Sequence, residues 1–491
     1  MVVLSVKFLG SNSINKLKDF SVTQKVLIIA IPSYHPFVIA TCLEFALRNI
    51  QEGKRIIVIN LAWLLPDYYR KNFSRYADNF SFKPPVNYAI KSWCKTYEVP
   101  YFEPKFTHKF SRDFSRINSS FIESIFEVTL RSVHSKSFGT KDFNINKINR
   151  TLRFSNRNSF TSVLDYLHEF FLINSHIQVD KIVTVNGRFL IDSAVVLYCK
   201  LNDTKYSVLE TVTSDWNNFI EFEIGIHNLS EAFELMMDQW HTDYSIDPIK
   251  TSNIAVGHME KRLSNTWSWN PGLGDGKDIT PVDKKFVTFF PSTDWEFGVY
   301  EYLNDIGHIS TQHEVFRWVA EFCQANNYCL IVRVHPHPNN PRIAEIENTI
   351  WEKLTIMYGG ILIKSNDSIN SHKIAKESFF NIVYQSSIGA EFLYLGYPTI
   401  ITRKTLYTLL VPESEATTKE QFNNLIKSYP IINDRKRLLP WAYFSENGGT
   451  QLNFFKNLDN YTSTYKNGNF LQRRPWFLKM RRIYTQFTKF F

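Results

Sequence analysis

The segment YCLIVRVHP, residues 328–336, decides the fold of the second half of the chain. A short, continuous apolar run of this kind is typical of a strand buried on both faces of a parallel sheet. Helical patterns lie on either side of it, at residues 311–327 and at residues 341–359, where Pro341 suits the start of a helix. Because strands and helices alternate in this way from residue 285 onward, we expect a doubly wound, Rossmann-like α/β domain.

The first half of the chain repeats this pattern. The apolar run KVLIIAI (25–31) is followed by a helical segment at 37–53 and by a second apolar run, KRIIVINLAW (54–63). This order is the signature of a strand-helix-strand unit in a parallel sheet. Further strands are expected at 181–189 and at 205–211.

The domain boundaries follow from composition. Residues 268–284 (SWNPGLGDGKDITPVDK) are rich in Gly, Pro and Asp and lack periodicity, as an interdomain linker does. The sequence therefore predicts an N-terminal domain over 1–267 and a C-terminal domain over 285–470. Two such domains would face each other across a cleft, with ligands at the carboxyl ends of the strands.

Two basic segments stand out. Residues 106–162 interrupt the first domain, and their basic stretch is either a solvated loop or a patch that faces a glycan or a membrane. Residues 471–491 predict a basic amphipathic helix, which either lies on an anionic membrane surface or packs on the body of the protein. Its apolar stripe consists of Trp476, Met480, Ile483, Phe487 and Phe490.

Composition and motif content argue against several classes of protein: disordered chains, nucleic-acid-binding proteins, and proteins built on zinc or disulfides. A chain of 491 residues with 44% hydrophobic and 21% charged residues is long enough for two folded domains. The net charge of +9 favours anionic partners such as a nucleotide or a membrane surface, while no nucleic-acid motif is present, so no nucleic acid is expected. The five cysteines form no CxxC pair, which argues against a zinc site or a disulfide framework.

The expected location is the cytoplasm. The N-terminus lacks the pattern of a signal peptide, and the longest apolar runs are far shorter than the roughly 20 residues of a membrane-spanning helix. The tail at 473–491 adds the alternative of peripheral attachment at the inner face of the plasma membrane. His335 and His337 are two residues apart, but no carboxylate or cysteine lies near them in sequence, so no metal is expected.

Polar residues follow the expected strand ends of the second domain. Arg333 and His335 share one face of a strand, because they are two residues apart. A serine pair at the next strand-to-helix junction offers a helix cap and an anion site, Gly389 leaves room for a phosphate, and Glu391 is placed to bind ribose hydroxyls. A simple helix cap and a solvated charge are the structural alternatives. The candidate donor-binding residues are Arg333, His335, Gln385, Ser386, Ser387, Gly389 and Glu391.

These motifs carry a family resemblance. Arg333-Val334-His335-Pro336 and the segment from Gln385 to Pro398 (QSSIGAEFLYLGYP) resemble the capsule-polysaccharide-synthesis family of bacterial glycosyltransferases, which includes Kdo transferases. The His-Pro pair is also similar to the motif that bacterial sialyltransferases use around the phosphate of a CMP-sugar. The resemblance implies a GT-B fold and places donor phosphate and nucleotide binding on His335, Ser386, Ser387 and Glu391.

The first domain supplies candidates for the acceptor side. Asn186 and Arg188 follow an apolar strand and resemble a segment of sugar-polymer transferases, so they are expected to line the acceptor cleft. An inverting transferase needs a base within reach of the acceptor hydroxyl. Glu210, His35 and Asp215 are the candidates for this role.

The resulting hypothesis is an inverting, metal-independent glycosyltransferase without a cofactor. It would move a sugar from a nucleotide-activated donor, with a CMP-sugar favoured, to a surface polysaccharide or lipid-linked glycan. Polymerases that transfer glycerol phosphate share the Arg-x-His-Pro strand end. A glycerophosphotransferase-like or epimerase-like enzyme, and a non-catalytic glycan-binding protein, therefore remain alternatives.

Overall fold

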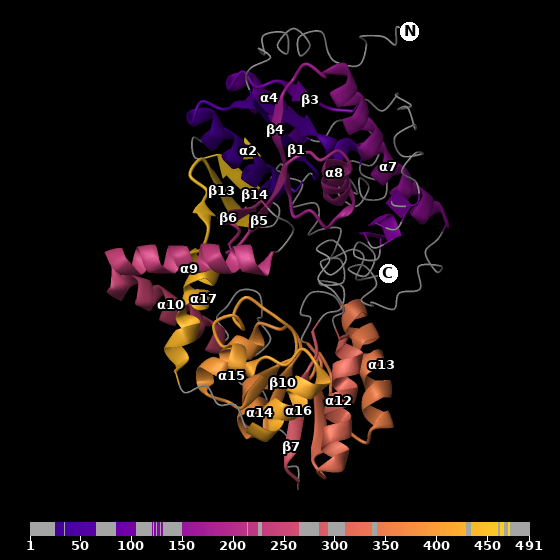
Figure 1. The fold of residues 1–491 in the computed structure, drawn as a ribbon, viewed down its shortest axis with the longest axis vertical. Helices are drawn as coiled ribbons and strands as arrows, with labels where there is room; N and C mark the ends of the chain where they lie inside the picture. The colour runs from indigo at the N-terminus through magenta and orange to yellow at the C-terminus, as the bar shows by residue number, and fades with distance from the viewer. Residues whose placement is uncertain are drawn as a thin grey trace, which may run out of the picture.

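The computed structural model describes residues 25–64, 85–104, 120–130, 150–264, 284–292, 310–335, 341–428, 434–459, 462–465 and 470–471, apart from 34, 121, 124, 128, 214 and 224–227. Most of the predicted linker, much of the basic segment 106–162 and the tail after residue 471 lie outside the described residues. The predicted pair of Rossmann-like α/β domains is confirmed (Figure 1).

The first domain is built on a seven-stranded sheet in the order β12-β6-β5-β4-β1-β2-β3. β1 to β5 run parallel, whereas β6 pairs antiparallel with β5 and β12 antiparallel with β6. The strands of this sheet are β1 (Val26–Ile31), β2 (Arg55–Asn60), β3 (Tyr101–Phe102), β4 (Val179–Val185), β5 (Tyr206–Thr211), β6 (Asn218–Phe222) and β12 (Thr450–Gln451).

Helices cover both faces of this sheet, as the continuous apolar run of β1 requires. Alternate residues of a strand point to opposite faces, and Val26, Ile28 and Ala30 pack with α7 and α8 while Leu27, Ile29 and Ile31 pack with α2. The elements around the sheet are α2 (Pro36–Gln51), the 3₁₀ turn η1 (Leu61–Leu64), α4 (Pro85–Thr96), α7 (Arg150–Ile173) and α8 (Leu190–Leu201).

The second domain has a five-stranded sheet, all parallel, in the order β11-β10-β7-β8-β9. Its strands are β7 (Phe286–Phe290), β8 (Cys329–Arg333), β9 (Ile361–Ile363), β10 (Phe380–Val383) and β11 (Thr399–Ile401). The other elements are α12 (Gln312–Ala325), α13 (Pro341–Met357), α14 (Ser371–Glu377), α15 (Ile388–Leu395), η3 (Pro412–Ser414), α16 (Lys419–Ser428) and η4 (Arg435–Leu438).

A layer of three helices joins the two sheets on one side (Figure 1). These helices are α9 (Leu229–Ile246), α10 (Pro248–Leu263) and α17 (Leu439–Asn447). Their apolar residues form one continuous core with both domains, from Phe222 on β6 through Met259 and Trp441 to Phe290 and Phe392. Burial of this shared surface fixes the domains to each other through the hydrophobic effect. No described helix is long and apolar enough to cross a bilayer.

The chain returns to the first domain before it ends, which differs from the predicted boundary at residue 470. β12 joins the edge of the first sheet, and a small antiparallel sheet packs on α2. Its strands are β13 (Phe455–Asp459), β14 (Thr462–Tyr465) and β15 (Phe470–Leu471).

The Glu44 carboxylate holds this returning segment in place. Glu44 lies on α2 with none of its surface exposed, and it accepts hydrogen bonds from the backbone N–H groups of Asn453 (2.8 Å), Phe454 (2.7 Å) and Phe455 (3.1 Å). Arg48 pairs with the same carboxylate at 3.1 Å. Hydrogen bonds to a charged acceptor are stronger than neutral ones, so one side chain ties residues more than 400 positions away to α2.

We predict that Glu44→Ala lowers the free energy of unfolding by about 3 kcal/mol, because it leaves buried N–H groups without an acceptor. Urea unfolding followed by circular dichroism measures this loss. Glu234→Ala, at an exposed position of α9, is the matched control. Equal stability of the Glu44 variant and the control would contradict the role given to Glu44.

Candidate functional site

Each sheet has a topological switch point, where the chain order reverses between neighbouring strands. In the first sheet it lies between β1 and β4, and in the second between β7 and β10. Ligands of open α/β sheets bind at the carboxyl ends of the strands beside such a point. The loops found there contain His35 after β1, Asn186 after β4, Ser292 after β7 and Gln385 after β10.

The turn after β4 brings Asn186 and Glu210 together. Asn186 (φ 66°) and Gly187 (φ 73°) are both left-handed, a conformation that asparagine and glycine adopt more readily than other residues. The Asn186 backbone N–H donates to the Leu209 carbonyl at 2.9 Å, which extends the pairing of β4 and β5. The Asn186 Nδ2 group then donates to both carboxylate oxygens of Glu210, at 3.2 and 3.1 Å.

Burial shifts the pKa values of two carboxyl groups near this turn, those of Glu210 and Asp192. Desolvation raises the pKa of Glu210 to about 7, against the opposing effect of the Arg188 guanidinium, with the nearby Asp192 adding to the rise. Desolvation also raises the pKa of Asp192 to about 7, although Arg188 and backbone N–H groups such as that of Phe189 favour its charged form. Two carboxyls and one cation thus share the carboxyl end of β4 and β5, with proton affinities near neutrality.

The other two candidate bases have different surroundings. The Asp215 carboxylate accepts hydrogen bonds from the Thr213 hydroxyl (2.7 Å) and from the backbone and side-chain nitrogens of Asn217 (3.0 and 2.9 Å). Burial alone would raise its pKa, but these hydrogen bonds hold it below the usual range. Asp215 therefore stabilises the turn before β6 and is a poor base.

His35 precedes α2 at its N-cap position. Its ring centroid lies 5.6 Å from that of Phe37, which in turn stacks on Trp216 at 5.5 Å. His35 thus lies in the loop after β1, the strand next to β4, and the loop after β5 contributes Trp216 to the same aromatic group.

Arg333 does not fit the phosphate-binding role predicted for it. The side chain is 2% exposed, and its guanidinium donates to the carbonyls of Lys364, Asp367 (3.3 Å) and Ile369 (3.3 Å) and to the Ser371 hydroxyl (3.4 Å). Burial lowers its pKa to about 10. Arg333 holds the loop between β9 and α14, so its donors are committed within the protein.

His335 lies at the same edge of the sheet, directly after β8. The Val334 backbone N–H donates to the Ile363 carbonyl at 3.0 Å, which keeps the chain in register with β9 up to this point. The imidazole of His335 is partly buried. His335 therefore extends from the end of β8, two strands away from Gln385 in the sheet order.

The segment Gln385–Ser387 turns sharply from β10 into α15. Gln385 is left-handed (φ 51°), and Tyr407 donates its hydroxyl to the Ser386 carbonyl at 2.7 Å. Ser387 occupies the N-cap position but makes no side-chain cap bond. A Cβ on Gly389 would lie 2.5 Å from Ile401 Cδ1 and from the Tyr407 hydroxyl. Gly389 is thus required for close packing of α15, which differs from the predicted reason, access for a phosphate.

Glu391 belongs to a buried ion-pair network and is not an open ribose ligand. The Arg262 Nε group on α10 donates to Glu391 Oε1 at 2.8 Å, and Arg262 Nη2 donates to the Ser387 hydroxyl at 2.7 Å. His372 Nε2 lies 2.7 Å from Glu391 Oε2. Burial alone would raise the pKa of Glu391, but Arg262 and His372 hold it below the usual range.

One buried amide oxygen at each switch point lacks a partner among the residues that the structure describes. These atoms are Asn186 Oδ1 in the first domain and Gln385 Oε1 in the second. An unsatisfied buried acceptor is costly, so natural proteins seldom keep one without a reason such as a ligand. The sequence identified both residues by their positions. It gave no sign of Arg262 or His372, which lie on helices with ordinary periodicity.

Comparisons with known proteins add the following. No protein-family model matches the chain, and no curated protein matches it. The chain is similar to a putative UDP-N-acetylglucosamine 2-epimerase from Listeria monocytogenes (12% identity, 88% of this chain and 93% of that one, TM-score 0.23). It is also similar to KpsC of Thermosulfurimonas dismutans, a β-Kdo 2,4-transferase (13% identity, 54% of this chain and 79% of that one, TM-score 0.31). A third similar structure is the UDP-GlcNAc 2-epimerase of Methanocaldococcus jannaschii (10% identity, 84% of this chain and 97% of that one, TM-score 0.27).

We predict that Arg262→Met destabilises the protein by about 3 to 5 kcal/mol, because Glu391 stays buried without its cation. The double variant with Glu391→Gln should recover a large part of that loss, since it removes the isolated charge. Chemical unfolding of the two single variants and the double variant measures this coupling. Arg317→Met, at an exposed position of α12, is the control. Strictly additive losses would contradict the network.

Proposed function

We propose that this protein is an inverting, metal-independent glycosyltransferase of the GT-B type. The second domain binds a nucleotide-activated sugar, with a CMP-sugar favoured, and the first binds a surface polysaccharide or a lipid-linked glycan as acceptor. Two α/β domains with polar residues at both switch points support this proposal. His335-Pro336 at the end of β8 and the serine pair of the second domain support it as well.

The observation that carries the proposal is the Glu210 carboxyl at the end of β5, with a pKa raised to about 7 by burial. A general base works best when its pKa lies close to the working pH. Glu210 takes the proton of an acceptor hydroxyl, and the oxygen forms a bond to the anomeric carbon of the donor. The bond from that carbon to the phosphate oxygen breaks, and the nucleotide leaves with the electron pair. Asn186 holds the carboxylate by its Nδ2 group, which fixes the direction of the proton transfer.

The leaving nucleotide requires stabilisation of its negative charge. His335 donates to a phosphate oxygen, and the backbone N–H groups at the start of α15 add the positive end of a helix dipole. Gln385 offers its unsatisfied Oε1 atom to an N–H group of the donor. Arg262 and Glu391 contribute to donor binding indirectly, because they hold the turn at Ser387 in position.

The first test concerns the base. Glu210→Gln keeps the size and the hydrogen-bonding oxygen of the side chain but cannot accept the proton, so transfer should fall by about 10²- to 10⁴-fold. In the wild type, kcat/KM should rise with pH to a plateau, with a midpoint near the Glu210 pKa of about 7, because only the deprotonated carboxylate acts as base. Glu234→Gln on α9 is the matched control. Full turnover in the Glu210 variant would refute the assignment.

A second test of Glu210 uses stability. Its pKa is raised from 4.5 to about 7 in the folded protein, so folding favours the protonated form. This contribution to stability is fully present below pH 4.5 and is lost as the pH rises to about 7. Glu210→Gln should therefore be more stable than the wild type at pH 8, and the difference should shrink at pH 5. Thermal unfolding at the two pH values measures this, and a difference independent of pH would contradict it.

The donor side is tested by thermal shift with CMP, CDP, UDP and GDP. A nucleotide that binds only the folded protein raises its Tm, and we expect the largest rise with CMP. His335→Ala should lose most of that rise while its circular dichroism spectrum stays unchanged. The largest rise with CDP would favour the glycerophosphotransferase-like alternative, and the largest rise with UDP the epimerase-like one. No rise with any nucleotide would leave the non-catalytic glycan-binding alternative.

A further inference from the structure

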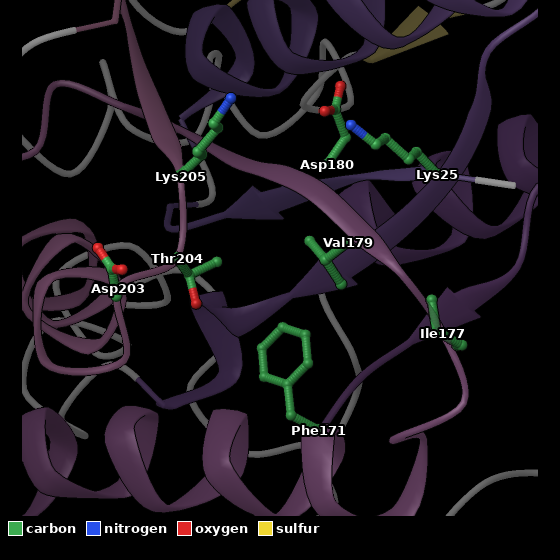
Figure 2. Close-up of a pocket in the computed structure, with 8 residues that line it drawn as sticks. All are labelled: Lys25, Phe171, Ile177, Val179, Asp180, Asp203, Thr204 and Lys205. Atoms are coloured by element: carbon green, nitrogen blue, oxygen red, sulfur yellow. The ribbon is translucent and has the colours of Figure 1, made fainter. Parts of the chain in front are cut away.

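A pocket lies at the amino ends of β1, β4 and β5, at the opposite end of these strands from the Asn186 turn (Figure 2). Its volume is about 310 Å³, at the small end of the roughly 300 to 1,000 Å³ range of ligand pockets. The lining residues are Lys25, Phe171, Ile177, Val179, Asp180, Asp203, Thr204 and Lys205. β4 is seven residues long, so this pocket is about 20 Å from the Asn186 turn.

The turns that form the pocket are held in place by local hydrogen bonds. Thr204 N–H donates to the Cys199 carbonyl at 2.9 Å, and Asp203 is left-handed (φ 49°). On the other side, Ile177 N–H donates to the Asn174 carbonyl at 2.9 Å. Phe171 is fixed by stacking on Tyr198, with ring centroids 5.6 Å apart and planes 9° apart. The pocket is therefore present before any ligand arrives.

The lining has two chemical parts. Phe171, Ile177 and Val179 give it an apolar part, and Figure 2 shows Phe171 extending from α7 towards Val179 on β4. The polar part contains two lysines, two aspartates and a threonine, listed above with the lining residues. The two cations and the two anions cancel, so an anionic ligand such as phosphate gains little from the site.

A sugar ring matches both parts. Its C–H face packs on aromatic and aliphatic side chains, and its hydroxyl groups donate to carboxylates and accept from ammonium groups at the same time.

We propose that this pocket is a second, non-catalytic saccharide-binding site for an uncharged part of the acceptor glycan. The identity of the ligand as acceptor rests on the proposed function, whereas saccharide binding itself does not. The direct distance of about 20 Å runs through the helix-covered sheet, so an acceptor that occupies the pocket and the Asn186 turn together has to pass around the helices and be longer than this. The site thereby retains a growing chain near the base between transfers, because a second contact raises its effective concentration.

The test measures saccharide binding to the full-length protein without nucleotide. Maltohexaose, cellohexaose and chitohexaose serve as probes in saturation-transfer difference NMR, with inorganic phosphate as the anionic probe by calorimetry. We expect binding of at least one saccharide and none of phosphate. Asp203→Asn and Lys205→Ala should each weaken saccharide binding about tenfold, the effect of one hydrogen bond to a charged group.

Two features keep this test decisive. Asp203 and Lys205 are exposed, and asparagine tolerates the left-handed backbone at 203, so both variants should fold. Lys353→Ala, at an exposed position of α13, is the matched control and should bind as the wild type does. No binding of any probe saccharide, or unchanged binding in both pocket variants, overturns the proposal. Saccharide binding that depends on Asp203 but is accompanied by no nucleotide-induced rise in Tm supports the site and refutes the proposed transferase.

Discussion

The buried ion pair between Arg262 and Glu391 connects the helix layer between the domains to the loop that carries the second switch point. Both side chains are 6% exposed, so each would be costly to bury alone. The Arg262 guanidinium also reaches the Ser387 hydroxyl and lies over the Trp441 ring on α17, 5.6 Å from its centroid. One cation thus determines how α10, α15 and α17 meet. The position of the Gln385 turn relative to the first domain depends on it.

Apolar packing of the helix layer also holds the two domains together, and the C-terminal segment that returns to the first domain adds to this connection. The chain passes from the first domain to the second through α9 and α10 and returns through α17, and these helices bury Met236, Met259 and Trp441 in one cluster. Glu44 then fixes the returned segment on α2 by accepting from consecutive backbone N–H groups. Because the chain crosses twice, movement of one domain relative to the other has to disturb contacts at both crossings.

The sequence predicted those features that depend on local patterns. Apolar runs such as 328–334 identified the parallel strands, and the parallel arrangement placed His335, Gln385 and Asn186 at strand ends. The partners of these side chains could not be predicted from the sequence, because they are residues far away in the chain. Glu391 pairs with Arg262, which is 129 positions earlier, and Arg333 turned inward to carbonyls of the loop after β9. The return of the C-terminal segment was missed for the same reason, since β12 and β13 are too short or irregular to indicate which sheet they join.

Glu210 and Asp215 show how the environment separates two carboxylates that are only five positions apart. Asp215 lies in a tight turn whose hydrogen bonds favour its charged form, so its pKa falls. Glu210 lies at the end of a buried strand beside Asp192, where desolvation outweighs the attraction of Arg188, and its pKa rises to about 7. The first arrangement stabilises the folded protein at neutral pH, and the second destabilises it. A fold that retains the unfavourable carboxyl at a switch point, next to an unsatisfied Asn186 oxygen, has a reason other than stability to keep it there.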